Sequence, residues 1–227
     1  MANPMSQPCD ILDQHMRRTL SAYVLKTTGI SKQKRKDPLQ YVAALFGRLR
    51  NVEFLKQLHS DYERLHGQKK WQNDDAVQAT LVQCFNLIIE RLAQDAFNEL
   101  TFVAVRKCFA SLAVEIESLQ NDPALNVLKT CIDLDAGELL VLQAYHDAEN
   151  APAASNAVDN WIATLSQHTG IASQDRLKSY NNSLVTKNIL EKKNTKKITP
   201  GPTYRLTEIG TAAALSIAVG SRILHSM

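Results

Sequence analysis

The chain has 227 residues, and its 26 basic and 23 acidic side chains give a formal net charge of +3. That average hides three unlike segments, because residues 1–36 carry +5, residues 37–170 carry −8 and residues 171–227 carry +6, which favours a polyanion contacting the ends of the chain. The hydrophobic fraction of 44% excludes a disordered charged tail, and eight glycines and seven prolines are too few for an all-β fold with many turns.

The first half of the chain has the pattern of a helical bundle. Between residues 38 and 123 there is no proline, and apolar residues recur every three or four positions. We expect about five helices from residue 9 to residue 132, and long helices with short links favour an antiparallel bundle. Residues 1–132 are therefore assigned to a helical domain for association or sensing. The basic run Ser31–Lys36 within it either contacts DNA phosphates or is a solvated loop, and both readings stay open.

The second half predicts three consecutive helices. Asp135 and Glu138 have the spacing of a capping box at the start of the first helix. The second helix ends at Thr169-Gly170, because glycine adopts the left-handed conformation of a tight turn. A third helix runs from about residue 173 to residue 184 or slightly beyond. Its buried side is expected to comprise Leu177, either Tyr180 or Asn181, and Leu184.

Residues 162–174 combine an apolar helix, a glycine turn and polar residues that open the next helix. This pattern resembles the helix-turn-helix of bacterial regulators. Further on, residues 184–185, 188–193 and 204–210 (Tyr-Arg-Leu-Thr-Glu-Ile-Gly) resemble a winged helix-turn-helix domain of the MarR-like kind. The resemblance implies a recognition helix, a strand, a basic wing and a last helix, in that order. The usual glycine after the recognition helix is Asn188 here, and asparagine also tolerates positive φ.

The sequence thus predicts a mainly α fold: an N-terminal antiparallel helical bundle at 1–132, then a C-terminal winged helix-turn-helix with a small β-hairpin wing at 133–227. In the last helix, Gly210, Ala214 and Ala218 follow one another at four-residue spacing, which lets another helix approach closely. Two readings stay open for this stripe of small residues. It either packs within the chain or forms a homodimer, whose two-fold symmetry would match palindromic DNA half-sites.

The third helix and the wing carry the residues expected to contact DNA. A helix in the major groove needs polar donors on its outer face, since Asn and Gln pair with adenine and Arg with guanine. Clustered lysines at a hairpin tip suit phosphates, whose contacts position a protein without reading sequence. The expected nucleic-acid-binding residues are Ser173, Gln174, Arg176, Lys178, Ser179, Asn181 and Asn182 on the helix, Lys187 after it, and Lys192, Lys193, Lys196, Lys197 and Arg205 on the wing.

Other kinds of site find little support in the sequence. The four cysteines lie at least 23 residues apart, too far for a zinc or redox motif, so reduced and mostly buried thiols are expected. His59 and His66 would lie about 10 Å apart along one helix face, too far for one ion, and both are expected at the surface. We therefore expect no catalytic site, cofactor or metal. Without a signal peptide or a bilayer-spanning stretch, the protein is expected in the cytoplasm and not at a membrane.

Two functions from different classes fit these observations. The leading hypothesis is a non-enzymatic DNA-binding protein, which the resemblance makes a transcriptional regulator of bacterial or phage type. Its expected partners are double-stranded DNA and a second copy of the chain. The alternative is a protein-interaction adaptor, for example in phage defence, whose winged helix or acidic bundle binds a protein partner. The operator sequence, the direction of regulation and any small-molecule effector stay open.

Overall fold

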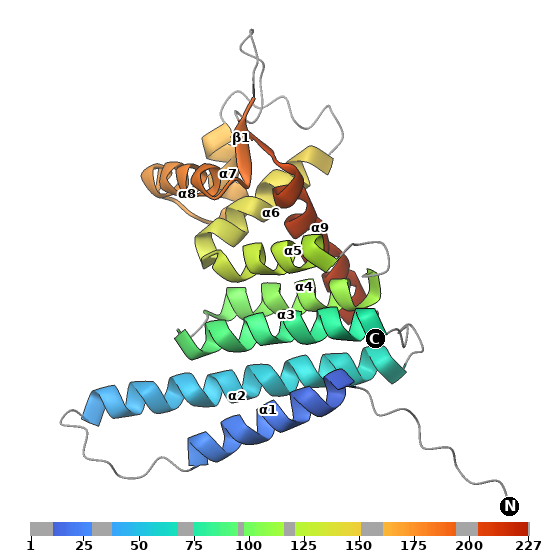
Figure 1. The fold of residues 1–227 in the computed structure, drawn as a ribbon. Helices are drawn as coiled ribbons and strands as arrows, with labels where there is room; N and C mark the ends of the chain where they lie inside the picture. Colours follow the sequence, from blue (N-terminus) through green and yellow to red (C-terminus); the bar gives the residue numbers. More distant parts are fainter. Residues whose placement is uncertain are drawn as a thin grey trace, which may run out of the picture. The chain divides into compact units, whose positions relative to one another are not determined.

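The computed structural model describes these parts of the chain: residues 11–28, 38–67, 75–94, 98–115, 121–150, 161–193 and 204–226. Within them the chain is mainly helical, with nine α-helices and one two-stranded antiparallel sheet (Figure 1). The expected mainly α fold is therefore confirmed, whereas its arrangement as a bundle followed by a winged helix stays a prediction. None of the described helices is both long and apolar enough to cross a membrane.

The described helices and strands follow one another with these bounds: α1 (Ile11–Thr28), α2 (Pro38–Gly67), α3 (Asp75–Gln94), α4 (Glu99–Glu115), α5 (Asn121–Asp133), α6 (Ala136–Asn150), α7 (Trp161–Thr169), α8 (Gln174–Thr186), β1 (Leu190–Lys192), β2 (Tyr204–Leu206) and α9 (Glu208–His225). Five helices, α1 to α5, lie in the first half of the described chain, the number that the apolar spacing predicts. After them come three helices, two paired strands and a final helix.

Two compact units make up the described chain. The first is drawn from residues 1–97, 112–125 and 223–227, and the second from residues 98–111 and 126–222. The predicted domain boundary between residues 132 and 133 falls inside the second unit. One contact that joins the start of α4 to this unit is the hydrogen bond from the Thr101 hydroxyl to the Leu134 carbonyl, at 3.4 Å.

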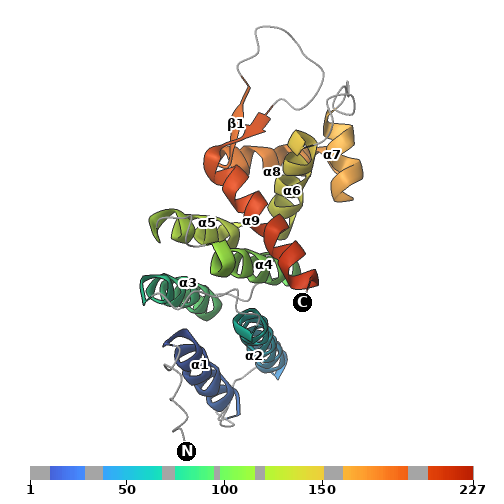
Figure 2. The same cartoon turned by 90° about the vertical axis from the view of Figure 1, so that its right-hand side faces the viewer.

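In the first unit, α1 packs against both α2 and α3 (Figures 1 and 2). Residues three or four positions apart fall on one side of a helix, so the apolar residues that recur at this spacing form the packed faces. The largest fully buried side chains of these helices include Leu12 and Met16 of α1, Leu55, Leu58, Tyr62 and Leu65 of α2, and Leu81, Phe85 and Ile88 of α3. The buried Gln78 of α3 accepts a hydrogen bond from the Leu12 backbone N–H at 3.4 Å, and so satisfies a donor that the first turn of α1 leaves unpaired.

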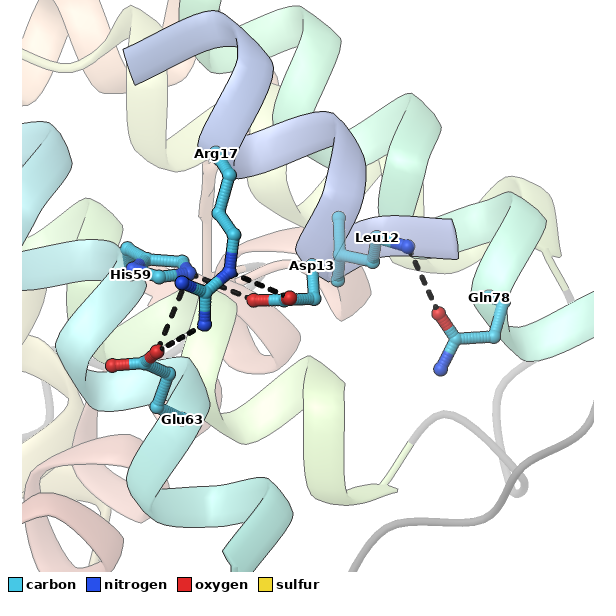
Figure 3. A network of polar contacts seen from close by, with 6 residues as sticks. All are labelled: Leu12, Asp13, Arg17, His59, Glu63 and Gln78. Carbon is cyan, nitrogen blue, oxygen red and sulfur yellow. Dashed lines mark hydrogen bonds and ion pairs between the residues drawn. The ribbon is translucent and has the colours of Figure 1, made fainter. Parts of the chain in front are cut away.

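A polar cluster also joins α1 to α2 (Figure 3). The His59 ring nitrogen Nε2 lies 2.9 Å from Oδ1 of Asp13, and Arg17 makes ion pairs of 2.7 Å with both Asp13 and Glu63. The expectation that His59 is a surface residue is wrong, because its side chain is only 11% exposed. Its partner Asp13 lies 46 positions away in the sequence, beyond the reach of any local pattern. The side chain of His66 is outside what the structure describes.

The second unit has a core of its own around α6, which packs against α7, α8 and β2. Its buried side chains include Val141, Leu142 and Tyr145 of α6, Trp161 and Leu165 of α7, Leu177 and Leu184 of α8, Leu190 of β1 and Leu206 of β2. The rings of Tyr145 and Trp161 meet edge to face with their centroids 5.3 Å apart, an arrangement that aromatic quadrupoles favour. This core fixes α7 and α8 relative to α6.

The small residues of α9 pack within the second unit. A Cβ atom added to Gly220 would overlap the backbone of Lys107 in α4, and one added to Gly210 would overlap the carbonyl of Ile189. Ala214, between the two glycines, is fully buried. Gly210 and Gly220 therefore pack against the chain's own backbone and Ala214 is buried, whereas Ala218 is half-buried. The expected homodimer stays a prediction.

Candidate nucleic-acid interface

The turn between α7 and α8 has the geometry that the sequence predicts. Gly170 has a φ of +69°, in the left-handed region that glycine adopts without strain. Its backbone N–H donates to the Ser166 carbonyl at 3.0 Å, and the Ser166 hydroxyl donates to the Ile171 carbonyl at 2.9 Å. An added Cβ at Gly170 would meet no atom within 4 Å, so the need for glycine comes from the backbone conformation alone.

Both ends of α8 are set by residues that the sequence singles out. Ser173 is the N-cap, and its side-chain oxygen accepts a hydrogen bond from the Arg176 backbone N–H at 3.3 Å. Beyond the other end, Asn188 has a φ of +57°, the conformation for which the pattern usually provides glycine. The helix runs over Gln174–Thr186 and so ends slightly beyond Leu184, as expected.

One face of α8 is buried and the opposite face is polar and exposed. Leu177, Asn181 and Leu184 share the buried face, because they are spaced by four and three residues. Of the seven residues expected to contact DNA from this helix, the exposed ones are Ser173, Gln174, Arg176, Lys178, Ser179 and Asn182. Lys178 makes a 3.7 Å ion pair with Asp175 on the surface, which solvent weakens.

Asn181 is the exception among the expected DNA contacts. Its exposed fraction is only 3%, so its side chain is not available to a nucleic acid and the expectation is corrected. Of the two alternatives for the buried side, Asn181 is buried, whereas Tyr180 is half-buried. The Tyr180 ring lies against Gly137 of α6, where an added Cβ would overlap the ring.

Lys187, also expected to contact DNA, is held by a buried carboxylate of α6. Its ammonium lies 2.6 Å from Oε2 of Glu138 and donates to the Asp133 carbonyl at 2.9 Å. Glu138, with 3% of its side chain exposed, also accepts from the Ser183 hydroxyl at 2.5 Å and, as the expected capping box requires, from the Asp135 N–H at 2.8 Å. Burial raises the pKa of the Glu138 carboxyl, but these bonds outweigh it and hold the pKa below its usual value. Lys187 thus anchors the end of α8 to α6.

We expect Glu138→Gln to destabilise the protein by about 2 kcal/mol at neutral pH, because Lys187 loses its buried counter-charge. The carboxylate stabilises the fold above the usual glutamate pKa of 4.5, and this contribution is lost as the pH falls through the lower pKa of the folded state. The difference in stability between wild type and variant is therefore expected to shrink at acid pH. Urea unfolding across this pH range measures it.

Glu191→Gln is the matched control for that experiment. It breaks the ion pair between Glu191 and Arg205, which is equally short at 2.6 Å but exposed on both sides. Because solvent screens such a pair, the expected loss is below about 0.5 kcal/mol. Equal losses for the two variants at every pH would contradict the anchoring role of Glu138.

β1 and β2 pair in antiparallel register, with Leu190 opposite Leu206. The hairpin is tied to α6 because the backbone N–H of Leu206 donates to the Glu149 carboxylate at 3.0 Å. Arg205 pairs with Glu191 across the two strands, so part of its charge is neutralised. The other wing residues divide as follows: Lys192 is exposed, Lys193 is half-buried, and Lys196 and Lys197 lie outside the described residues.

The exposed residues of α8 outside the expected set are Asp175, Val185 and Thr186. Val185 is 39% exposed and follows Asn182 by three positions, while Asp175 precedes Asn182 by seven, so Asp175, Asn182 and Val185 fall on one side of the helix. An apolar side chain can contact the methyl group of thymine, and a carboxylate can accept from the cytosine amino group. Helical periodicity counted from Asn182 would have found Asp175 and Val185.

No protein-family model, curated protein or solved structure matches the chain. The resemblance to MarR-like domains accordingly rests on the sequence residues quoted above and stays a prediction.

Proposed function

We propose that α6 to α9, with β1 and β2, form a winged helix-turn-helix that binds double-stranded DNA. In this proposal α8 enters the major groove and the hairpin of β1 and β2 is the wing beside it. The observation that carries the proposal is α8 with its N-cap, where six polar or basic side chains are exposed after a left-handed glycine turn. Side chains of these types donate to base edges and phosphates.

The distribution of charge supports the same proposal. Residues 171–227 carry +6, and within them Arg176, Lys178 and Lys192 are exposed. Cations of this kind bind phosphates and release counter-ions, which supplies affinity that does not depend on sequence. Residues 37–170 carry −8, a charge that disfavours contact with a polyanion.

We further propose that the chain regulates transcription, as bacterial and phage proteins of the resembled kind do. Two copies would then bind the two half-sites of a palindromic operator. The alternative is an adaptor that binds a protein partner through its acidic part, residues 37–170. The two proposals differ in the salt dependence of DNA binding.

A salt titration of binding to a random duplex DNA tests the proposed function. We expect the logarithm of the affinity to fall linearly with the logarithm of the salt concentration, with a slope of about −4 or steeper. Arg176→Gln is expected to lower the affinity about 10-fold. Lys56→Gln, which removes an exposed charge from α2, is expected to leave it unchanged. Weak binding at low salt that barely responds to added salt would overturn the proposal and favour the adaptor.

A further inference from the structure

Three metal-ligating side chains meet where α1 packs against α2 (Figure 3). Nε2 of His59 lies 2.9 Å from Oδ1 of Asp13 and 3.8 Å from Oε1 of Glu63. One donor atom from each of the three residues lies within 4.8 Å of the other two. Among the side chains that the structure describes, these three are the His, Cys, Asp or Glu residues that lie close enough together to hold one ion.

We propose that Asp13, His59 and Glu63 bind a divalent transition-metal ion, for which Zn²⁺ is the best fit. Zn²⁺ takes imidazole nitrogen and carboxylate oxygen at roughly 2.0–2.1 Å in tetrahedral geometry, so that neighbouring donor atoms are about 3.3 Å apart. The observed separations of 2.9 and 3.8 Å lie on either side of that value. The remaining pair of donors, on Asp13 and Glu63, lies within 4.8 Å. Side-chain movements of up to about 1.5 Å therefore bring the donors around one ion, and a water molecule completes the four ligands.

The backbone presents these ligands in a way that suits chelation. His59 and Glu63 are four residues apart on α2, so their side chains leave the same face of the helix one turn apart. A helix can bind one zinc ion on one face through two ligands at this spacing. Asp13 supplies the third ligand from α1, and the buried contacts between the two helices hold it in place.

The donor set selects the class of ion. Ca²⁺ takes six to eight oxygen ligands and Mg²⁺ keeps an octahedral shell of oxygens, whereas two carboxylates and one imidazole offer too few oxygens for either. Imidazole nitrogen with carboxylate oxygen suits Zn²⁺ and its neighbours in the first transition row. We therefore expect selectivity for these ions over Mg²⁺ and Ca²⁺.

Arg17 would compete with the ion for the carboxylates of Asp13 and Glu63. Its Nε lies 2.7 Å from Oδ2 of Asp13 and its Nη2 lies 2.7 Å from Oε1 of Glu63, so it neutralises both carboxylates. The Arg17 side chain is 59% exposed, so it can turn into solvent when an ion takes its place.

Calorimetric titration of the full chain with ZnCl₂ tests the proposal. We expect one ion per chain and, at saturation, an increase in the unfolding temperature of about 4 °C or more. Co²⁺ in place of Zn²⁺ is expected to give the strong visible absorption of a four-coordinate ion. His59→Ala removes the nitrogen donor and is expected to lower the affinity about 100-fold.

His15→Ala is the matched control, because it removes a histidine of the same helix pair that bonds Asn86 at 2.7 Å and lies outside the cluster. It is expected to leave the Zn²⁺ affinity unchanged, whereas Arg17→Gln is expected to raise the affinity several-fold. Equal losses in His15→Ala and His59→Ala overturn the proposal. Should His59→Ala fail to fold, the Co²⁺ spectrum of the wild type and the effect of Arg17→Gln decide it, and a weak octahedral spectrum with no effect of Arg17→Gln overturns it.

Discussion

We expect the replacement of four lysines of the proposed wing, Lys192, Lys193, Lys196 and Lys197, by glutamine to lower the affinity for random duplex DNA about 100-fold at low salt. Each contact between a lysine and a phosphate releases about one counter-ion, so the slope of log affinity against log salt is expected to become shallower by about three to four units. Fluorescence anisotropy of a labelled duplex across a salt series measures both quantities.

A control with the same loss of charge separates local contact from net charge. It replaces four exposed basic residues outside the proposed interface by glutamine: Arg48, Lys56, Lys129 and Arg222. If the wing binds phosphates directly, the control keeps most of the affinity and nearly the full salt slope. If both variants lose affinity to the same extent, the wing has no special part in binding and the proposed arrangement on DNA is wrong.

Gly220→Ala is the single substitution for which we expect the largest loss of stability, about 3 kcal/mol or more. The new Cβ would overlap the Lys107 backbone of α4, and backbone cannot move aside as a flexible side chain can. Either α9 or α4 must therefore shift, which also disturbs the buried Ser216 one turn earlier on the same face of α9. Urea unfolding followed by circular dichroism measures the loss.

Gly47→Ala is the same chemical change in a different setting. An added Cβ at Gly47 would meet no atom within 4 Å, and Gly47 lies inside the regular helix α2. Alanine is the better helix former, so this variant is expected to gain up to about 1 kcal/mol. Opposite signs for the two variants would establish that the contact at Gly220 is native; a neutral Gly220→Ala would show that α9 does not pack there.

The parts of the candidate interface that follow from backbone chemistry could be predicted from the sequence. Gly170 and Asn188 both have positive φ, as expected, because few residue types suit that conformation. Ser173, expected only as a DNA contact, also caps α8. The capping box of Asp135 and Glu138 is confirmed for the same reason. In each case the backbone conformation or the unpaired backbone group lies at the residue itself or within four positions of it.

The parts that depend on distant contacts could not be predicted. Lys187 is exposed, as an expected DNA contact must be, but the sequence does not predict its ion pair with Glu138, which lies 49 positions earlier. The sequence also does not predict the burial of His59, because its partner Asp13 lies 46 positions away. Asn181 is polar on a buried helix face, and only the packing of α8 on α6 distinguishes it from Tyr180. Residue type and spacing do not report which helix covers which face.

The pairing of β1 with β2 has a consequence for how the segment between them can change. Because Lys192 lies opposite Tyr204, the ends of residues 193–203 are fixed by the ladder whatever sequence joins them. Closing a flexible loop costs only about 0.6 kcal/mol more for each doubling of its length. Because the paired strands hold both ends, we expect residues inserted into this segment to cost little stability, which makes its length adjustable by evolution and a practical site for a spectroscopic label.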